Sequence, residues 1–196
     1  MISQKRKAIN YLFYGILGVQ KKLRRYLTSS NLSYDEIMDN RKNSRDFDFA
    51  EYCESWFPQL VSTEHFELVI DGCQYTRAEK TERISEWEIA QKFLNVCIHP
   101  INQGHNCSKC EKCMWTLLPL EAMGKLDQFG NVFDIETYRK NREWFKRKFV
   151  SRTGRDSMET SIVEYVSRKG MTVPSVPMAK ALHFQDRAFR KLGFKS

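Results

Sequence analysis

No apolar run in the chain is long enough to cross a bilayer. The most apolar stretch, Ala8–Val19, is interrupted by Asn10 and is shorter than the roughly 20 residues that a spanning helix needs. It also lacks the small-residue cleavage site of a secretory signal. Leu12, Ile16 and Val19 follow helical spacing between basic flanks, which predicts a helix packed on the protein's own body or, alternatively, one lying flat on an anionic membrane. We expect a cytoplasmic protein without a membrane partner.

Internal repeats and low-complexity tracts are also absent, which argues against repeat and disordered architectures. Apolar residues make up 41% and charged residues 29% of 196 residues, a mixture typical of an ordinary globular domain. Lysine and arginine outnumber the acids 32 to 24, giving a net charge of +8. This balance favours attraction to phosphates or anionic surfaces, but it identifies no partner.

No secretory signal accompanies the six cysteines, and a chain of this length does not need disulfide bonds to be stable. Reduced thiols are therefore expected instead of three disulfides. Cys53 and Cys73 have no metal-type spacing and are expected to behave as small buried apolar residues.

The other four cysteines have the spacing of a metal site. Cys107, Cys110 and Cys113 are each separated by two residues, which lets the backbone curl so that the sulfurs point inward. Cys97 is the nearest further thiol, across a loop containing glycine and proline, and completes the predicted structural zinc site. His99 and His105 are the alternatives for the fourth ligand.

Two other interpretations of the cluster stay open. The spacing also occurs in iron–sulfur ferredoxins, but the Cys-Pro that usually follows there is missing here. Three or four unligated thiols are the second alternative. Cys110 and Cys113 fall at the start of a predicted helix, whose positive end favours thiolates.

The fold class that the pattern predicts is mostly α with a small β element, with helices packed around the four-cysteine loop. We expect a strand at Phe66–Ile70, closed by Asp71-Gly72. Capping boxes at Thr76–Glu79 and Ser85–Glu88 predict two helices between Arg77 and Leu94. Further helices are expected over Ser3–Leu27, Glu111–Met123, Ile135–Phe149, Ser157–Lys169 and Pro177–Leu192. Asp134 is the predicted cap of the helix at Ile135–Phe149, and Gly124 and Gly170 directly follow two of the other helices. Loop and short helical turns are expected over Thr28–Asp48. The predicted regions are 1–48, 49–133 and 134–196.

The cysteine segment carries a family resemblance. Asn106-Cys107-Ser108-Lys109-Cys110-Glu111-Lys112-Cys113, followed by Thr116-Leu117 and Leu120-Glu121, resembles the Asn-Cys-Gly-x-Cys-Glu-Lys-Cys segment of bacterial PP-loop proteins, relatives of 7-cyano-7-deazaguanine synthase. The resemblance covers roughly Pro58–Phe133. Its upstream matches are Leu60-Val61-Ser62-Thr63, Asp71-Gly72, Thr76-Arg77-Ala78-Glu79-Lys80 and Val96-Cys97.

This resemblance implies a structural zinc ion on the four cysteines, downstream of an ATP-pyrophosphatase domain. The family's Ser-Gly-Gly-x-Asp-Ser loop, which wraps phosphates with backbone amides, is missing before the cluster. Thr153-Gly154-Arg155-Asp156-Ser157 echoes that loop but lies after the cysteines, and Asp156 with Glu159 is better explained as a helix cap. We therefore expect that the chain alone neither catalyses a reaction nor binds ATP. The implied partner is a separate PP-loop catalytic subunit.

Some positions depart from the family or have two interpretations. Trp115 stands where the family has arginine, and Pro119 should kink or restart a helix that relatives continue. Arg77 and Lys80 match the family's Arg-x-x-Lys spacing and, one turn apart, can face an anionic ligand together. The alternative is a solvated helix face, because Glu79 and Glu82 lie beside them.

A second function of a different class is a stand-alone zinc module that binds nucleic acid through a basic helix. The basic residues that favour it are Arg139, Lys140, Arg142, Lys146, Arg147 and Lys148.

Overall fold

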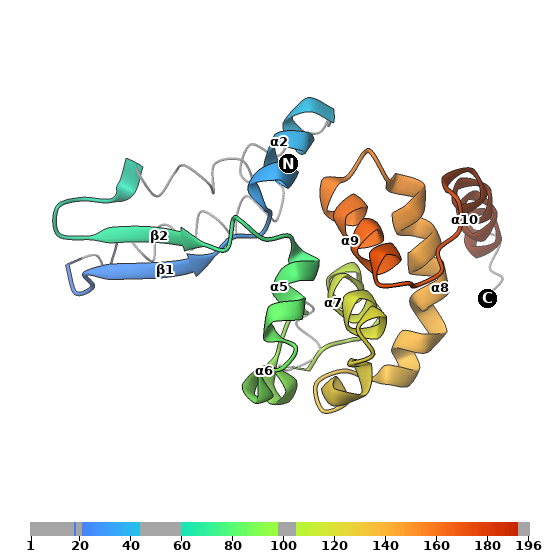
Figure 1. Ribbon diagram of the computed structural model, residues 1–196, viewed down its shortest axis with the longest axis horizontal. Coiled ribbons are helices and arrows are strands. Elements are labelled where there is room, and N and C mark those ends of the chain that lie inside the picture. Colours follow the sequence, from blue (N-terminus) through green and yellow to red (C-terminus); the bar gives the residue numbers. More distant parts are fainter. Residues whose placement is uncertain (1–17, 19–20, 44–59, 98–104, 192–196) are drawn as a thin grey trace. The chain divides into compact units, whose positions relative to one another are not determined.

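The computed structural model describes residues 18, 21–43, 60–97 and 105–191, and it divides into two units, 1–75 and 76–196 (Figure 1). The described residues are mostly helical with one small parallel sheet, so the prediction of a mostly α chain with a small β element is confirmed. Helices on both sides of residue 133 belong to the second unit. Except for Gly18, the stretch Ala8–Val19 lies outside the described residues, as do Cys53 and His99. No helix among the residues described has the length and apolar character needed to cross a bilayer.

The first unit contains a parallel strand pair. Strand β1 (Arg25–Ser29) pairs with β2 (Glu67–Asp71), so that Leu27 lies opposite Val69. The predicted strand at Phe66–Ile70 is therefore confirmed with a shift of one residue. Helix was predicted through Leu27, and this was wrong for β1. The pattern around β1 gave no sign of a partner strand about 40 residues away, and that distant pairing overrides the local helical spacing.

Helix α2 (Tyr34–Asn43) lies between the strands in sequence, where loop and short helical turns were predicted and a longer helix is found. A capping box starts it: the Ser33 N–H donates to Glu36 Oε2 at 2.7 Å, and the Glu36 N–H donates to Ser33 Oγ at 3.2 Å. The Ser-x-x-Glu signal was present in the sequence but was hidden within a polar stretch.

The second unit opens with helices α5 (Arg77–Ile84) and α6 (Glu88–Phe93). The capping box of Thr76 and Glu79 is confirmed, with both reciprocal hydrogen bonds present. The box predicted at Ser85–Glu88 was wrong, because Ser85 ends α5: its hydroxyl donates to the Glu82 carbonyl at 2.6 Å. Trp87 occupies the N-cap of α6 and makes no capping bond through its side chain.

Helix α7 (Glu111–Ala122) is the centre of this unit, and its buried residues include Met114, Leu117, Leu118 and Leu120. Around it lie α5, the short 3-10 helix η2 (Leu126–Phe129), α8 (Ile135–Arg152) and α9 (Ser157–Arg168), while α10 (Val176–Lys191) lies beside α8 (Figure 1). The predicted restart at Pro119 is not observed, because α7 continues through this residue. Gly124 ends α7 with φ of 70°, as its position after the helix predicted.

Glu159 on α9 is an acidic side chain inside the helical core. It is 1% exposed, and Arg152 donates to its Oε1 at 3.0 Å. Its other oxygen has no hydrogen-bond partner in the described part of the chain. Burial, with a smaller contribution from Asp156, raises the pKa of Glu159 to about 7. The Asp156 cap of α9 is present, but Glu159 does not return the bond because its carboxylate faces Arg152.

We expect the Glu159→Gln variant to change how stability depends on pH. The pKa of Glu159 is about 7 in the folded chain, above its ordinary value of 4.5, so between these two pH values the folded state holds a proton that the unfolded state has lost. The free energy of unfolding is therefore highest below pH 4.5, where Glu159 is protonated in both states, and it falls as the pH rises toward 7. The decrease is up to ~3 kcal/mol, at 1.36 kcal/mol per pKa unit. Urea unfolding from pH 5 to 8 should show this decline in the wild type and a flatter profile in the variant. Glu164→Gln, exposed on the same helix, is the control, and equal pH slopes in all three proteins would contradict the assignment.

Candidate metal centre

Three of the four cysteines come from the start of α7 and the turn before it. Cys107 lies in the turn, Cys110 is the N-cap of α7, and Cys113 is in the first helical turn. Cys97 comes from the segment that follows α6. The fully buried Cys113 fixes the group to the core, while the other three are half-buried.

The four sulfurs form a group of the size that one metal ion requires, since all lie within 4.8 Å of one another. The Sγ–Sγ distance is 3.5 Å for Cys110 and Cys113, 3.8 Å for Cys107 and Cys113, and 4.0 Å for Cys97 and Cys110. A tetrahedron with metal–sulfur bonds of about 2.3 Å has edges of about 3.8 Å. The distances also exceed a disulfide bond of about 2.05 Å, so the thiols are separate. This group is positioned to hold a metal ion.

The sulfurs interact strongly even as thiols. Above all the thiol of Cys113, and also its backbone N–H, donate toward Cys110, which lowers the pKa of Cys110 to about 4 despite its partial burial. The same hydrogen bond and burial raise the pKa of Cys113, and burial raises the pKa of Cys107. The group therefore accommodates one negative charge readily and resists further ionisation. A cation at its centre would compensate the additional thiolate charges.

Asn106 joins Cys97 to the rest of the site. Its Oδ1 accepts from the backbone N–H groups of Val96 at 2.8 Å and Cys97 at 3.1 Å. Its Nδ2 donates to the carbonyls of Leu94 at 2.7 Å and Val132 at 2.9 Å. Asn106 is buried, with a relative exposure of 7%, and both the oxygen and the nitrogen of its side-chain amide form hydrogen bonds. Asn106 thus holds the segment carrying Cys97 against the cysteine turn.

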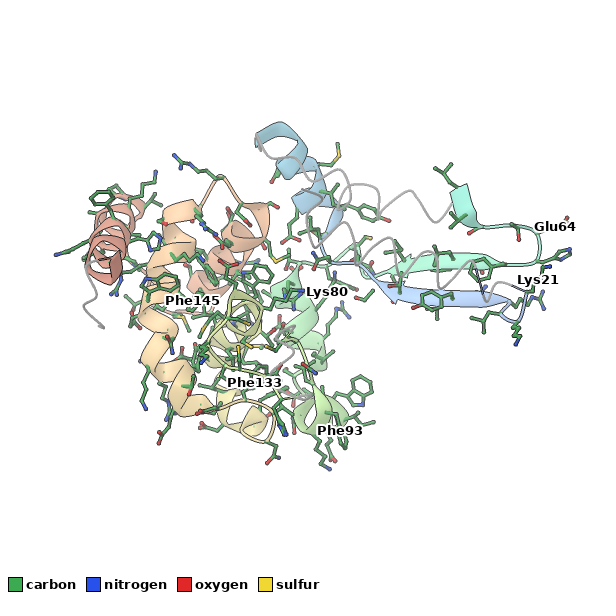
Figure 2. All side chains as sticks on the ribbon, turned by 180° about the vertical axis from the view of Figure 1, so that it is seen from behind. Lys21, Glu64, Lys80, Phe93, Phe133 and Phe145 are labelled. Carbon is green, nitrogen blue, oxygen red and sulfur yellow. The ribbon has the colours of Figure 1, made fainter. Side chains whose placement is uncertain are left out.

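Ser108 connects the same turn to α8. It is fully buried, and its Oγ accepts from the backbone N–H of Asp134, the N-cap of α8, at 2.9 Å. The backbone φ of Ser108 is 53°, in the left-handed region that residues other than glycine rarely adopt. Asn106 contacts Val132, and Ser108 contacts Asp134. Phe133, labelled in Figure 2, lies between these two residues in the sequence. Cysteine spacing predicted the ligands, but no spacing rule pointed to these two supporting residues.

The predicted anion-binding pair lies on α5. The Arg77 guanidinium lies 5.6 Å from the centroid of the Trp115 ring, a cation–π distance, and Lys80 lies one turn further along the helix (Figure 2). Trp115 therefore serves as a cation–π partner for a basic residue. Binding of an anion by Arg77 and Lys80 stays a prediction.

The turn around Gly154 has the structure of a helix connection. The Gly154 N–H donates to Thr160 Oγ1 at 2.9 Å, and the N–H groups of Arg155 and Asp156 donate to the Arg152 carbonyl at 2.9 and 3.2 Å. These amides are already engaged within the chain, so they do not form an open cradle for phosphate. This agrees with the predicted capping role of Asp156.

The basic residues of α8 lie beside acids. Each of the six that were predicted to favour nucleic acid has a carboxylate within 4.0 Å. The pairs are Arg139 with Asp127, Lys140 with Glu136, Arg142 with Glu121 and Glu143, Lys146 with Glu143, Arg147 with Asp186, and Lys148 with Glu111. Paired charges give a weaker positive field than the residue count suggests.

Comparison with known proteins gave no match to a protein-family model, a curated protein or a solved structure.

Proposed function

We propose that this chain is a zinc-binding module in which one structural Zn²⁺ is held by Cys97, Cys107, Cys110 and Cys113. The observation that carries the proposal is the compact group of four sulfurs, with separations close to the edges of a zinc–thiolate tetrahedron. Four protein ligands close the coordination sphere, whereas a catalytic zinc keeps one position for water or substrate. The zinc therefore organises the fold and does not act on a substrate.

Metal analysis tests this function. Protein purified without added metal is expected to contain about one equivalent of zinc, as a closed four-thiolate site requires. The control is Cys73→Ala, which removes a buried cysteine from outside the group and should leave the zinc content unchanged. Less than about a tenth of an equivalent of zinc, or bound iron with sulfide, would contradict the assignment.

We further propose that the module is the C-terminal zinc-bearing part of a PP-loop ATPase-like protein and works with a separate catalytic subunit, without being catalytic alone. The support is the order of matching segments along the sequence, ending in the cysteine cluster. The parallel β1–β2 pair with α2 between its strands in sequence is also the kind of element from which nucleotide-binding α/β folds are built. An adjacent reading frame that encodes Ser-Gly-Gly-x-Asp-Ser would support this relation, and neighbouring frames without it would count against it. Nucleic-acid binding stays the alternative prediction, and the paired charges of α8 do not favour it.

A further inference from the structure

The parallel sheet of the first unit has one open edge in the described part of the chain. Parallel strands normally occur in sheets of several strands that are covered on both faces. Two strands alone are marginally stable at best. The β1–β2 pair, with five residues in each strand, is small by this standard.

The hydrogen bonds between the strands show which backbone groups point outward. The Glu67 N–H donates to the Arg24 carbonyl at 2.9 Å, and the Ser30 N–H donates to the Asp71 carbonyl at 2.8 Å. Since backbone groups alternate along a strand, those of Arg25, Leu27 and Ser29 point away from β2. No backbone hydrogen bond to another described residue uses them.

The two edges of the sheet differ. On the outer edge of β2, the Leu68 N–H donates to Ser62 Oγ at 3.0 Å, so the chain itself occupies part of that edge. On β1, Leu27 is 65% exposed, whereas Tyr26 on the other face packs against Phe66 and Leu68. The edge of β1 therefore combines unused backbone groups with an exposed apolar side chain at its middle residue.

The start of β1 also carries positive charge. Lys21, Lys22 and Arg24 form no ion pair with a carboxylate among the described residues. Arg25 pairs with Glu67 at 2.5 Å, but both side chains are more than half exposed, so this pair contributes little. An incoming strand with acidic residues at this end would complement the charge.

We propose that the outer edge of β1 binds an extended strand of a separate protein, with acidic side chains of that strand facing Lys21–Arg25. This inference rests on the proposed function, because it specifies where the catalytic subunit docks. The backbone of Arg25, Leu27 and Ser29 supplies the hydrogen bonds, and Leu27 supplies apolar contact. Such strand addition gives affinity through the main chain and specificity through alternate side chains.

The test uses the full chain and a fluorescein-labelled peptide of two aspartates followed by alternating valine and threonine. Saturable binding is expected by fluorescence anisotropy, with affinity falling as salt is added. A peptide N-methylated at alternate amides, which cannot pair with the edge, should bind at least about tenfold more weakly. Hydrogen exchange at the Leu27 amide should slow when the unmodified peptide binds, because this amide then gains a partner.

Leu27→Pro removes the outward N–H but leaves the β1–β2 bonds, which use the neighbouring residues, and proline is tolerated at such edge positions. It should weaken peptide binding about tenfold or more, while Leu27→Ala, which keeps the N–H, should weaken it less. No saturable binding up to about 1 mM, equal binding of the methylated peptide, or unchanged exchange at Leu27 would overturn the proposal. A dimer that Leu27→Pro converts to monomer would also overturn it, because a second copy would then occupy the edge.

The peptide assay and the tests of the proposed function fail separately. The four cysteines lie outside the unit that contains β1, so zinc content does not decide peptide binding. Neighbouring reading frames without the nucleotide-binding loop would remove the proposed catalytic partner, while peptide binding would still establish the edge as a docking surface.

Discussion

The Cys113→Ser variant is expected to purify with less than about a tenth of an equivalent of metal and to lose the structure around Cys97 and the cysteine turn. Cys113 is the fully buried member of the group, and its sulfur lies 3.5 Å from Cys110 and 3.8 Å from Cys107. The binding free energy of a structural zinc ion is folding free energy, about 10–16 kcal/mol in zinc-finger peptides. Loss of one ligand should remove much of it.

Metal content by elemental analysis and thermal unfolding with and without a chelator provide the measurement. The wild type should be destabilised by the chelator, whereas Cys113→Ser should not respond because it has no metal to lose. Cys73→Ser is the matched control: it also places a hydroxyl at a buried cysteine, but outside the group, so it should retain both metal and chelator sensitivity. A Cys113→Ser protein with full metal content and an unchanged unfolding midpoint would show that Cys113 is not a structural ligand.

Asn106→Ala is expected to weaken metal binding by about 10–100-fold, the usual cost of losing a residue that orients a metal ligand. The substitution removes four hydrogen bonds from one buried side chain. It leaves two N–H groups and two carbonyls without these partners, each at a cost of about 1–3 kcal/mol where water cannot replace the bond. The segment carrying Cys97 should be affected most, because the bonds from Val96 and Cys97 to Asn106 hold it against the cysteine turn.

Cobalt substitution distinguishes a positioning role from general destabilisation. The absorption of Co²⁺ bound to four thiolates should change in Asn106→Ala if Cys97 no longer reaches the ion. Asn106→Asp keeps the shape and the accepting oxygen but places a carboxylate oxygen against the Leu94 and Val132 carbonyls, so it should also change the spectrum. Asn95→Ala is the control, since Asn95 also accepts from the Cys97 N–H at 3.1 Å but is exposed and does not bridge Cys97 to the cysteine turn. Equal cobalt spectra and affinities for wild type and Asn106→Ala would contradict the positioning role.

The features that the sequence predicted well are those with local causes. Thr76, Asp134 and Asp156 cap their helices as expected, because an N-cap bond spans only a few residues. Gly124 and Gly170 follow helices with positive φ for the same local reason. Likewise, a spacing of two residues was enough to predict that Cys107, Cys110 and Cys113 lie together.

The failures arise where distant parts of the chain compete with a local signal. Strand β1 was predicted as helix because its partner strand lies far along the sequence. Parallel strands are not joined by a hairpin turn, so the local sequence contains no signal of the pairing. The motif at Ser85 was valid locally, but the buried serine ends α5 and also accepts from Lys125 at 3.2 Å. Asn106 could not be recognised as the clamp on Cys97, since its role depends on carbonyls 12 and 26 residues away.

The hydrogen bonds of Asn106 and Ser108 connect the candidate metal centre to three helices. Together with the four cysteines, they tie the end of α6, the start of α7 and the start of α8 into one junction. With a metal ion bound, this junction would be a cross-link that needs reduced thiols and that exists only in the folded chain, because the unfolded chain has no preformed site. Chelation would then act on this protein as reduction acts on a disulfide-stapled domain: the segment carrying Cys97 would separate first, while the buried leucines of α7 would keep α7, α8 and α9 together. Supply of metal would thereby control how much of the chain is folded.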